Sequence, residues 1–423
     1  MAHHTLKSAY SQLVDRLNRF PQGAFPSETL FSILKLLFNE KEAELAAQLP
    51  IKPFPVKKAA RIWKVQPSEA EKLLESLAEK LVLVDIQDEN GEKLFFLPPP
   101  MVGFFEFTLM RTNGHLDQHL ISELFHQYLQ EEEDFFRLLF QGETQAGRIL
   151  VHEPAIDNDN KLHVFDYDRS SAIIQNAREI AVGICFCRHK MSHLGKACDT
   201  PLELCMSFDA PAEFLIRRGA GRGIDAVEAL DLLQMAYEKN LVQFGENVRE
   251  GVGYICNCCR CCCEAMIAAR KFGALNPIHT TAYMPVVDAE TCIGCGKCIK
   301  VCPVNALYYA NAETGEGLPK VKIYEEDCLG CGICSRVCPG RAIHFQERAE
   351  RIIPPLNSTH RIVKMAVERG KLQNLIFDDQ TLVSHRVLRA VLGAILKLPP
   401  AQRLLAGRQI GSSYIENLCR KFG

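Results

Sequence analysis

Two short stretches of the 423-residue sequence decide the fold of one part of the chain: CIGCGKCIKVCP at 292–303 and CLGCGICSRVCP at 328–339. Both have the spacing C-x2-C-x2-C-x3-C-P, and they repeat at a constant offset of 36 residues. Three cysteines this close on a tight loop can bind three irons of a cubic cluster. The positive φ that such loops need is available from four glycines, Gly294, Gly296, Gly330 and Gly332.

The fourth cysteine of each stretch lies too far along the chain to complete the same cube, and this spacing assigns it to the other cluster. Cluster A is then expected to take Cys292, Cys295, Cys298 and Cys338, and cluster B to take Cys328, Cys331, Cys334 and Cys302. Zinc is the alternative, but zinc favours two separated CxxC pairs, and neither stretch has that form.

Residues 288–345 resemble a dicluster ferredoxin domain, which implies two [4Fe–4S] clusters. The resemblance covers roughly one-seventh of the chain, and its motif is very specific. The insert at 308–322 is longer than in the shortest ferredoxins, and we expect it to form a surface hairpin without changing the ligands.

Ten further cysteines lie upstream of these stretches, six of them within the eight residues of CNCCRCCC (256–263). The ten are Cys185, Cys187, Cys198, Cys205, Cys256, Cys258, Cys259, Cys261, Cys262 and Cys263. A disulfide framework is excluded, because neighbouring cysteines point apart and dense disulfides belong to short secreted chains. The first residues, MAHHTLKSAY, also lack the pattern of a signal peptide. Reduced thiols in such numbers are metal ligands or redox groups.

The local pattern around these ten cysteines suggests how they could be grouped. Residues 180–185 resemble a buried strand, so Cys185 and Cys187 are expected on one face of its end. A helix that begins inside 256–263 would place Cys256, Cys259 and Cys263 on one face and Cys258, Cys261 and Cys262 on another. An extended strand would also divide these six cysteines between two faces, because successive side chains on a strand point in opposite directions. An amphipathic helix over 223–240, capped by Asp225, is expected to hold the two groups of cysteines together.

Three kinds of site remain open for the ten thiols: one or two further iron–sulfur clusters, structural zinc, or redox-active free thiols. Soft thiolates select iron–sulfur, zinc or Cu(I), and the neighbouring ferredoxin-like segment favours iron–sulfur. The pattern C-x-C-R-x9-C-x6-C followed by CNCCxCCC resembles a little-characterised group of multicluster iron–sulfur proteins of anaerobes, which implies extra clusters but no activity. Adjacent cysteines also occur in the CCG domain of heterodisulfide reductase subunits, but neither pair here is followed by glycine.

Four polar residues flank the first cysteines: Arg188, His189, Lys190 and His193. The simplest expectation is that they lie on the surface. Alternatively, cations and hydrogen-bond donors near sulfur raise the potential of a cluster. A histidine there could also bind a metal or move a proton.

The N-terminal region has the pattern of helices over 28–38, 55–63 and 68–80, followed by strands at 81–86 and 92–97 around an Asn-Gly turn. This order resembles a winged helix-turn-helix over 27–97. The segment 51–97 holds eight acidic and eight basic residues, and its third helix carries four glutamates, Glu69, Glu71, Glu75 and Glu79. Binding to phosphates requires a basic surface, so we expect this domain to dock a protein partner or the chain's own core, with DNA binding as the alternative.

The composition and the remaining sequence patterns bear on membrane spans, on location and on nucleotide binding. The net charge is −2, the apolar fraction is 47%, and the longest apolar runs, such as 390–396, are shorter than the about 20 residues of a membrane helix. A cytoplasmic location is expected by default. Residues 116–139, 386–397 and 402–408 have helical patterns, and Cys419 is interpreted as incidental. No G-x-G-x-x-G follows a strand and no P-loop is present, so no nucleotide or flavin site is expected.

Together these patterns predict an α+β multidomain chain: a winged-helix-like domain (1–110), a cysteine-rich α/β metal-binding domain (111–280), a 2[4Fe–4S] ferredoxin domain (281–350) and a helical C-terminal segment (351–423). The favoured function is the relay of single electrons between a partner oxidoreductase, a protein, and an additional middle-domain cluster. Two alternatives are a redox-sensing transcriptional regulator and an oxidoreductase with its catalytic centre at the middle cysteines.

Overall fold

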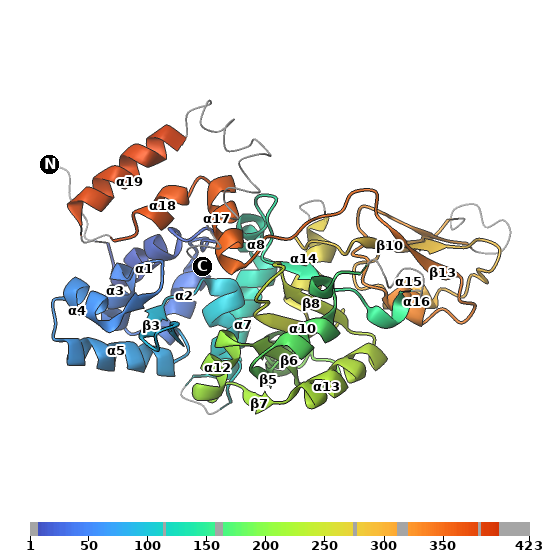
Figure 1. Ribbon diagram of the computed structural model, residues 1–423, viewed down its shortest axis with the longest axis horizontal. Coiled ribbons are helices and arrows are strands. Elements are labelled where there is room, and N and C mark those ends of the chain that lie inside the picture. The colour runs from blue at the N-terminus through green and yellow to red at the C-terminus, as the bar shows by residue number, and fades with distance from the viewer. Residues whose placement is uncertain are drawn as a thin grey trace. The chain divides into compact units, whose positions relative to one another are not determined.

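The computed structural model describes residues 7–112, 116–156, 164–273, 277–310, 320–379 and 382–396 (Figure 1). The chain forms two compact units. The first comprises Met1–Thr144, Phe214–Ala220 and Thr359–Gly423, and the second comprises Gln145–Glu213 and Gly221–Ser358. Both contain helices and small sheets, so the fold class is mixed α+β. None of the helices in the described parts of the chain is long and apolar enough to cross a membrane.

The first unit begins with five helices and a three-stranded sheet. The helices are α1 (Ala9–Leu17), α2 (Glu28–Leu37), α3 (Glu40–Gln48), α4 (Val56–Trp63) and α5 (Pro67–Glu79). The strands are β1 (Phe54–Pro55), β2 (Val84–Gln87) and β3 (Lys93–Phe96), in the order β1-β3-β2. The predicted hairpin is confirmed, because β2 and β3 pair antiparallel from Val84–Phe96 to Gln87–Lys93. The three predicted helices are also present, each within about one residue of its expected start, while α1 and α3 were not predicted.

The acidic face of α5 is partly neutralised within this unit. Glu75 pairs with Arg218 at 2.7 Å, and Glu79 pairs with Arg111 at 3.1 Å. Behind them Asp85 is buried and accepts from the Nε atoms of Arg217 and Arg218, both at 2.9 Å. Burial opposes ionisation of Asp85, but the two guanidinium groups outweigh it and lower the pKa of its carboxyl group. Two of the four glutamates of α5, Glu75 and Glu79, therefore meet basic side chains.

The remaining elements of the first unit are mainly helical. They are η1 (Pro100–Phe104), α6 (Phe105–Thr108), α7 (Gln118–His126), η2 (Gln127–Glu131), α8 (Asp134–Leu139), α18 (Leu372–Ile376), α19 (Val383–Leu396) and most of α17 (Ser358–Glu368). The helical patterns over 116–139 and 386–397 are thus confirmed over α7 to α8 and over α19. The expected helix at 402–408 and Cys419 lie outside the described residues.

The second unit is built on a six-stranded sheet with the order β4-β8-β9-β6-β5-β7. The strands are β4 (Gly147–Ile149), β5 (Ile180–Ile184), β6 (Glu203–Phe208), β7 (Arg222–Ile224), β8 (Val242–Glu246) and β9 (Tyr254–Cys258). All five pairings are antiparallel, so this part is α+β, whereas the sequence led us to expect α/β. α10 (Ser170–Asn176) and α13 (Ala226–Glu238) contribute Ile174, Ala229 and Leu233 to one apolar core with the sheet. Asp225 caps α13 as predicted.

The rest of the second unit carries the cysteine-rich loops. Its elements are η3 (Glu153–Ala155), η4 (Asp166–Asp168), α11 (Phe186–His193), the first half of α12 (Ala210–Arg217) and α14 (Glu264–Lys271), then β10 (Tyr283–Val287), α15 (Lys297–Val301), β11 (Leu307–Tyr309), β12 (Val321–Ile323), α16 (Ile333–Arg336) and β13 (Ile343–Glu347). β10 pairs antiparallel with β13, and β11 with β12. The strands of the expected insert hairpin are confirmed, whereas its residues 311–319 lie outside the described part.

Four glycines shape the two repeated loops as the sequence predicted. Gly294, Gly296, Gly330 and Gly332 have φ values of +67°, +67°, +69° and +85°. The second glycine of each pair stands directly before a helix, α15 or α16. Backbone in this left-handed region is unfavourable for residues with a Cβ atom, so the loop geometry depends on glycine at these positions.

Replacing Gly330 with alanine is expected to destabilise the second unit. A Cβ atom there would lie 2.2 Å from the Thr281 Oγ1 and 2.2 Å from the carbonyl oxygen of Tyr283. The matched control is Gly251→Ala, because Gly251 has a similar φ of +64° but nothing within 4 Å of the added atom. The clash should cost about 1–3 kcal/mol beyond the shared backbone strain. Thermal unfolding of the two variants measures this difference, and equal melting temperatures would contradict the packing at Gly330.

Candidate metal centres

The first repeated loop forms one side of a hollow that contains the four cysteines assigned to cluster A. Its lining includes Cys292, Cys295 and Cys298 together with Cys338 of the second repeat. Thus the fourth cysteine of the second repeat lies beside the three of the first. The walls are otherwise apolar side chains and loop backbone, including Val287, Val321 and Ile343.

The second loop has the reciprocal arrangement. Burial raises the pKa of Cys328, Cys331 and Cys334, and the nearby Cys302 adds to this rise because its negative charge disfavours a further thiolate. Cys302 therefore lies close to the three cysteines of the opposite repeat. Three thiols with raised pKa values are poorly stable as free thiolates, but a bound metal deprotonates its ligands and removes this penalty.

The two exchanged cysteines are also held in equivalent ways. The backbone N–H of Ala306 donates to Cys302 Sγ at 3.2 Å, and that of Ala342 donates to Cys338 Sγ at 3.3 Å. The donors and acceptors are each related by the 36-residue offset of the repeats. Hydrogen bonds to the sulfur ligands are one way in which a protein adjusts the potential of an iron–sulfur cluster. Both loops thus fit thiolate-bound clusters.

Six of the ten middle cysteines meet around one point of the second unit. Cys185 directly precedes α11, Cys187 lies in the first turn of α11, and Cys205 lies on β6. Cys256 and Cys258 lie on β9, and Cys263 directly precedes α14. The pairing of β6 with both β5 and β9 brings these segments together. We call this set the six-thiol ring.

Each thiol of the six-thiol ring has hydrogen bonds to two others. The contacts close a circle in the order Cys185, Cys187, Cys263, Cys258, Cys256, Cys205 and back to Cys185. The sulfurs of Cys258 and Cys263 are 3.1 Å apart. Of the six, Cys185, Cys258 and Cys263 are buried, and the others are half-buried.

The pKa values around the six-thiol ring alternate. Hydrogen bonds from both neighbours lower the pKa of three thiols, Cys185, Cys256 and Cys263, the last to about 6. Donation to both neighbours raises the pKa of the other three, Cys187, Cys258 and Cys205. The ring thus gathers six soft sulfur donors in one place, which is the donor chemistry that soft metals require.

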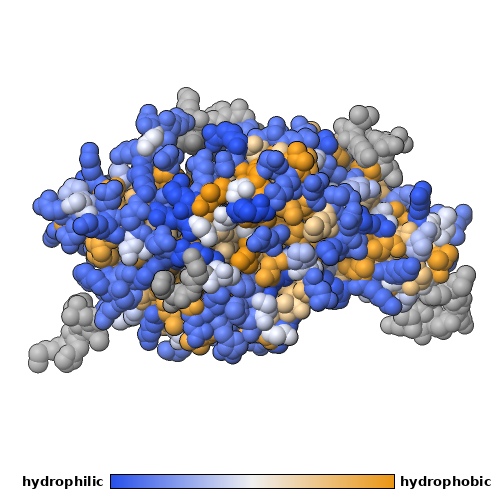
Figure 2. Space-filling model, turned by 90° about the horizontal axis from the view of Figure 1, so that it is seen from below, coloured by the Kyte–Doolittle hydropathy of each residue, from blue (hydrophilic) through white to orange (hydrophobic). Residues whose placement is uncertain are grey.

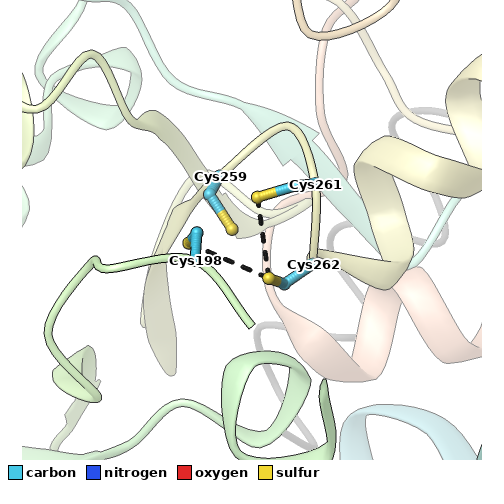
Figure 3. Close-up of side chains that lie close together, drawn as sticks. All are labelled: Cys198, Cys259, Cys261 and Cys262. Carbon is cyan, nitrogen blue, oxygen red and sulfur yellow. Dashed lines mark hydrogen bonds between the residues drawn. The ribbon is translucent and has the colours of Figure 1, made fainter. Parts of the chain in front are cut away.

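The other four middle cysteines form a second, tighter set, which we call the four-thiol site (Figure 3). It consists of Cys198 from the loop after α11 and Cys259, Cys261 and Cys262 from the turn after β9. All four sulfurs lie within 4.8 Å of one another. A hydrogen bond from Cys262, which outweighs burial, lowers the pKa of Cys259 to about 5, whereas burial raises the pKa of Cys261 to about 11.

The expected division of residues 256–263 into helix faces is wrong. The helix α14 begins only at Glu264, and β9 extends to Cys258. Because neighbours on a strand point to opposite faces, Cys258 enters the six-thiol ring while Cys259 enters the four-thiol site. Cys185 and Cys187 do lie together as predicted, although the strand ends before them and Cys187 is helical. Strand pairing joins the segments of the six-thiol ring, whereas we expected the helix α13 to hold the cysteine groups together.

The expectation that the polar residues after Cys187 lie on the surface is wrong for three of the four. Arg188 and Lys190 are 0% exposed and His189 is 5% exposed, while His193 is half-buried with its Nε2 3.1 Å from that of His189. The reason is that α11 packs inside the unit, where buried partners compensate the charges. Sequence reasoning missed these partners because they lie on β9 and α14.

Arg188 and Lys190 have different partners. Arg188 donates to the carbonyl oxygens of Pro201 and Asn257, and Lys190 forms an ion pair with the equally buried Glu264. Burial alone would lower the pKa of Arg188, but the negative charges of Cys185 and the thiols around it raise it. The Nε of Arg188 is buried and has no hydrogen-bond partner among the described residues. A cation with spare donor capacity fits a site that binds a sulfur-rich, negatively charged group.

Two arginines connect residues 256–263 to the second cluster loop. Arg260 donates to the carbonyl oxygen of Cys302 and, at 2.6 Å, to the side chain of Asn305. Arg270 donates to the carbonyl oxygens of Arg260 at 2.6 Å and Pro303 at 2.7 Å. The segment that supplies half of the six-thiol ring is therefore fixed against Cys302, a cysteine that the sequence assigns to cluster B.

Comparison with known protein families supports the assignment of the repeated loops. Residues 291–342 match the model of the 4Fe-4S dicluster domain. Comparisons with curated proteins and with solved structures found no significant match. With the cysteine clusters described above, this match indicates an iron–sulfur, metal-binding protein of the electron-transfer type.

Proposed function

We propose that this iron–sulfur protein relays single electrons between a partner oxidoreductase and a further iron–sulfur centre in the six-thiol ring. One observation carries the proposal. Cys258 and Cys263 of the ring belong to the same apolar core as Cys302, Cys328 and Cys334 of the second repeat. A continuous packed core between two groups of soft ligands is what a short electron path requires.

The residues that would hold the clusters follow from the contacts. Cluster A would take Cys292, Cys295, Cys298 and Cys338, cluster B would take Cys328, Cys331, Cys334 and Cys302, and the further centre would take the six-thiol ring. When bound, such clusters supply reversible one-electron oxidation and reduction at potentials that their surroundings adjust. The donor set fits, because thiolates are the ligands that iron–sulfur clusters use.

The side chains between the loops keep water away and compensate charge. Met266 and Ile333 are 0% and 1% exposed in the shared core, so the space between the thiols is apolar. Arg188 brings one buried positive charge to the six-thiol ring. A fixed cation stabilises the reduced, more negatively charged state of a nearby cluster, and this raises the reduction potential of that cluster. We expect Arg188 to raise the potential of the further centre.

Electrons would enter at the first loop, because that loop is the more exposed of the two. Cys295 is exposed, and the neighbouring Ile293 is 61% exposed, whereas Cys302, Cys328 and Cys334 are buried. The face in Figure 2 shows that apolar patches interrupt a mainly hydrophilic surface elsewhere as well. An exposed isoleucine beside a ligand loop offers an apolar contact for a protein partner.

The relay is tested by counting the electrons that the anaerobic protein accepts in a coulometric titration. Wild-type protein should accept clearly more electrons than the roughly two that two [4Fe–4S] clusters take up. The variant Cys205→Ser removes one thiol of the six-thiol ring from β6 and should return the count to about two. Metal analysis of the same variant controls for loss of the ferredoxin clusters. Equal counts for the two proteins would contradict the proposed relay.

Sequence-specific DNA binding by the N-terminal region is not expected. Specific regulators bind with affinities that depend on many phosphate contacts. The helix α5 carries four glutamates. Two of them, Glu75 and Glu79, form ion pairs with Arg218 and Arg111, so these two arginines are already paired with carboxylates. A selection from random duplexes, with clusters intact and removed, should therefore yield no motif. Recovery of a defined motif bound in the nanomolar range at physiological salt would instead support a redox-sensing regulator.

A further inference from the structure

The four-thiol site differs in size from the other cysteine sets of the chain. The sulfurs of Cys198 and Cys262 are 3.8 Å apart, those of Cys261 and Cys262 are 3.6 Å apart, and all four lie within 4.8 Å of one another. Figure 3 shows the four side chains gathered together, with dashed lines from Cys262 to Cys198 and to Cys261. No other three histidine, cysteine or acidic side chains are this close together among the described residues, which include all eight ferredoxin-type cysteines.

These distances match one ion at the centre of four sulfurs. A tetrahedral zinc ion bound to thiolates at about 2.3 Å separates its sulfurs by about 3.8 Å. In a four-iron cube each thiolate binds a different iron, so the four sulfurs are held further apart. The ferredoxin-type sets serve as an internal standard, because none of their triplets comes within 4.8 Å.

The surroundings of the four-thiol site suit a structural ion. Cys259 and Cys262 are buried, Cys198 is half-buried, and Cys261 is exposed, so an ion can enter from one side. Arg188 forms a hydrogen bond with Cys259. Arg270 is close enough to Cys259 and Cys261 to interact electrostatically with both thiols. These cations offset the excess negative charge that four thiolates and one divalent ion carry together.

We propose that Cys198, Cys259, Cys261 and Cys262 bind a single zinc ion that holds the loop after α11 to the turn between β9 and α14. All four ligands come from the protein, which is the pattern of structural zinc sites, whereas catalytic sites keep a position for water. The ten middle cysteines then divide into four for zinc and six for the further iron–sulfur centre. The zinc site does not depend on what the six-thiol ring holds.

The test is elemental analysis of full-length protein purified without oxygen, with Cys261→Ser as the variant and Cys258→Ser as the matched control from the same segment. Wild-type protein should contain about one zinc per chain. Cys261→Ser should lose this zinc and keep its iron, and Cys258→Ser should lose iron and keep its zinc. Iron that falls in Cys261→Ser while zinc stays unchanged, or wild-type protein without zinc, would overturn the proposal.

X-ray absorption at the zinc edge of the wild-type protein keeps the proposal testable if Cys261→Ser does not fold. The expected spectrum has four sulfur neighbours at about 2.3 Å. Nitrogen or oxygen neighbours would overturn the four-cysteine site. Unchanged iron in Cys258→Ser would count against the further iron–sulfur centre and would leave the zinc result standing, so the two proposals fail separately.

Discussion

Replacing Cys338 with alanine is expected to remove cluster A, although the other three ligands of cluster A lie in the first repeat. The reason is the exchange of the fourth ligand: Cys338 lines the hollow that holds Cys292, Cys295 and Cys298. Cys302→Ala should likewise remove cluster B, whose other ligands lie in the second repeat. Each variant should lose about four irons per chain. Iron analysis combined with electron paramagnetic resonance of the reduced protein measures the loss.

Three control variants separate exchanged from local ligation. Cys295→Ala removes a first-repeat ligand and identifies the signal of cluster A, while Cys331→Ala does the same for cluster B. Cys338→Ala should match the spectrum of Cys295→Ala and not that of Cys331→Ala. Cys419→Ala changes the one cysteine outside all four sets and should leave the iron content intact. A match between Cys338→Ala and Cys331→Ala would contradict the exchange.

Removing either partner of the buried ion pair between Lys190 and Glu264 is expected to destabilise the second unit strongly. The side chains are 0% and 2% exposed, so Lys190→Met or Glu264→Gln leaves one charge or polar group buried without its partner. Such a loss costs about 3–5 kcal/mol. For a unit of this size the melting temperature should fall by about 10 °C. Scanning calorimetry of anaerobic protein at one scan rate measures the change.

The double variant and a surface pair provide the controls for this prediction. Lys190→Met combined with Glu264→Gln should cost less than the two single losses added together, because it leaves no unpaired charge. Arg178→Met disrupts the pair between Arg178 and Asp209, in which Arg178 is 83% exposed, and should change the melting temperature little. Additive effects of the two buried replacements would show that Lys190 and Glu264 do not act as a pair.

The parts of the structure that could be predicted are those that depend on short-range sequence. The spacing of Cys292 to Cys302, and of its repeat, assigns loops and ligands because each loop closes within about ten residues. The start of α13 at its cap Asp225 and the hairpin between β2 and β3 could likewise be predicted, because a helix cap and a turn are each defined by a few neighbouring residues. The two middle sites were not readable in this way, since strand pairing between segments some 50 residues apart assembles them.

The buried cations were missed for a related reason. Charged residues are almost never fully buried unless they are paired, so Arg188 and Lys190 were expected on the surface. Their partners, Asn257 and Glu264, lie about 70 residues further along the chain. A glutamate directly after six cysteines and at the start of an apolar helix was the one available signal. Its meaning depended on knowing that α11 and α14 meet.

The most direct test of the account is the iron content of full-length protein purified without oxygen, measured together with acid-labile sulfide. Two ferredoxin-type clusters account for about eight irons per chain. The account predicts clearly more than eight in wild-type protein, and a return to about eight in Cys205→Ser, which breaks the six-thiol ring only. Wild-type protein that holds about eight irons, with no change in Cys205→Ser, would contradict a further iron–sulfur centre.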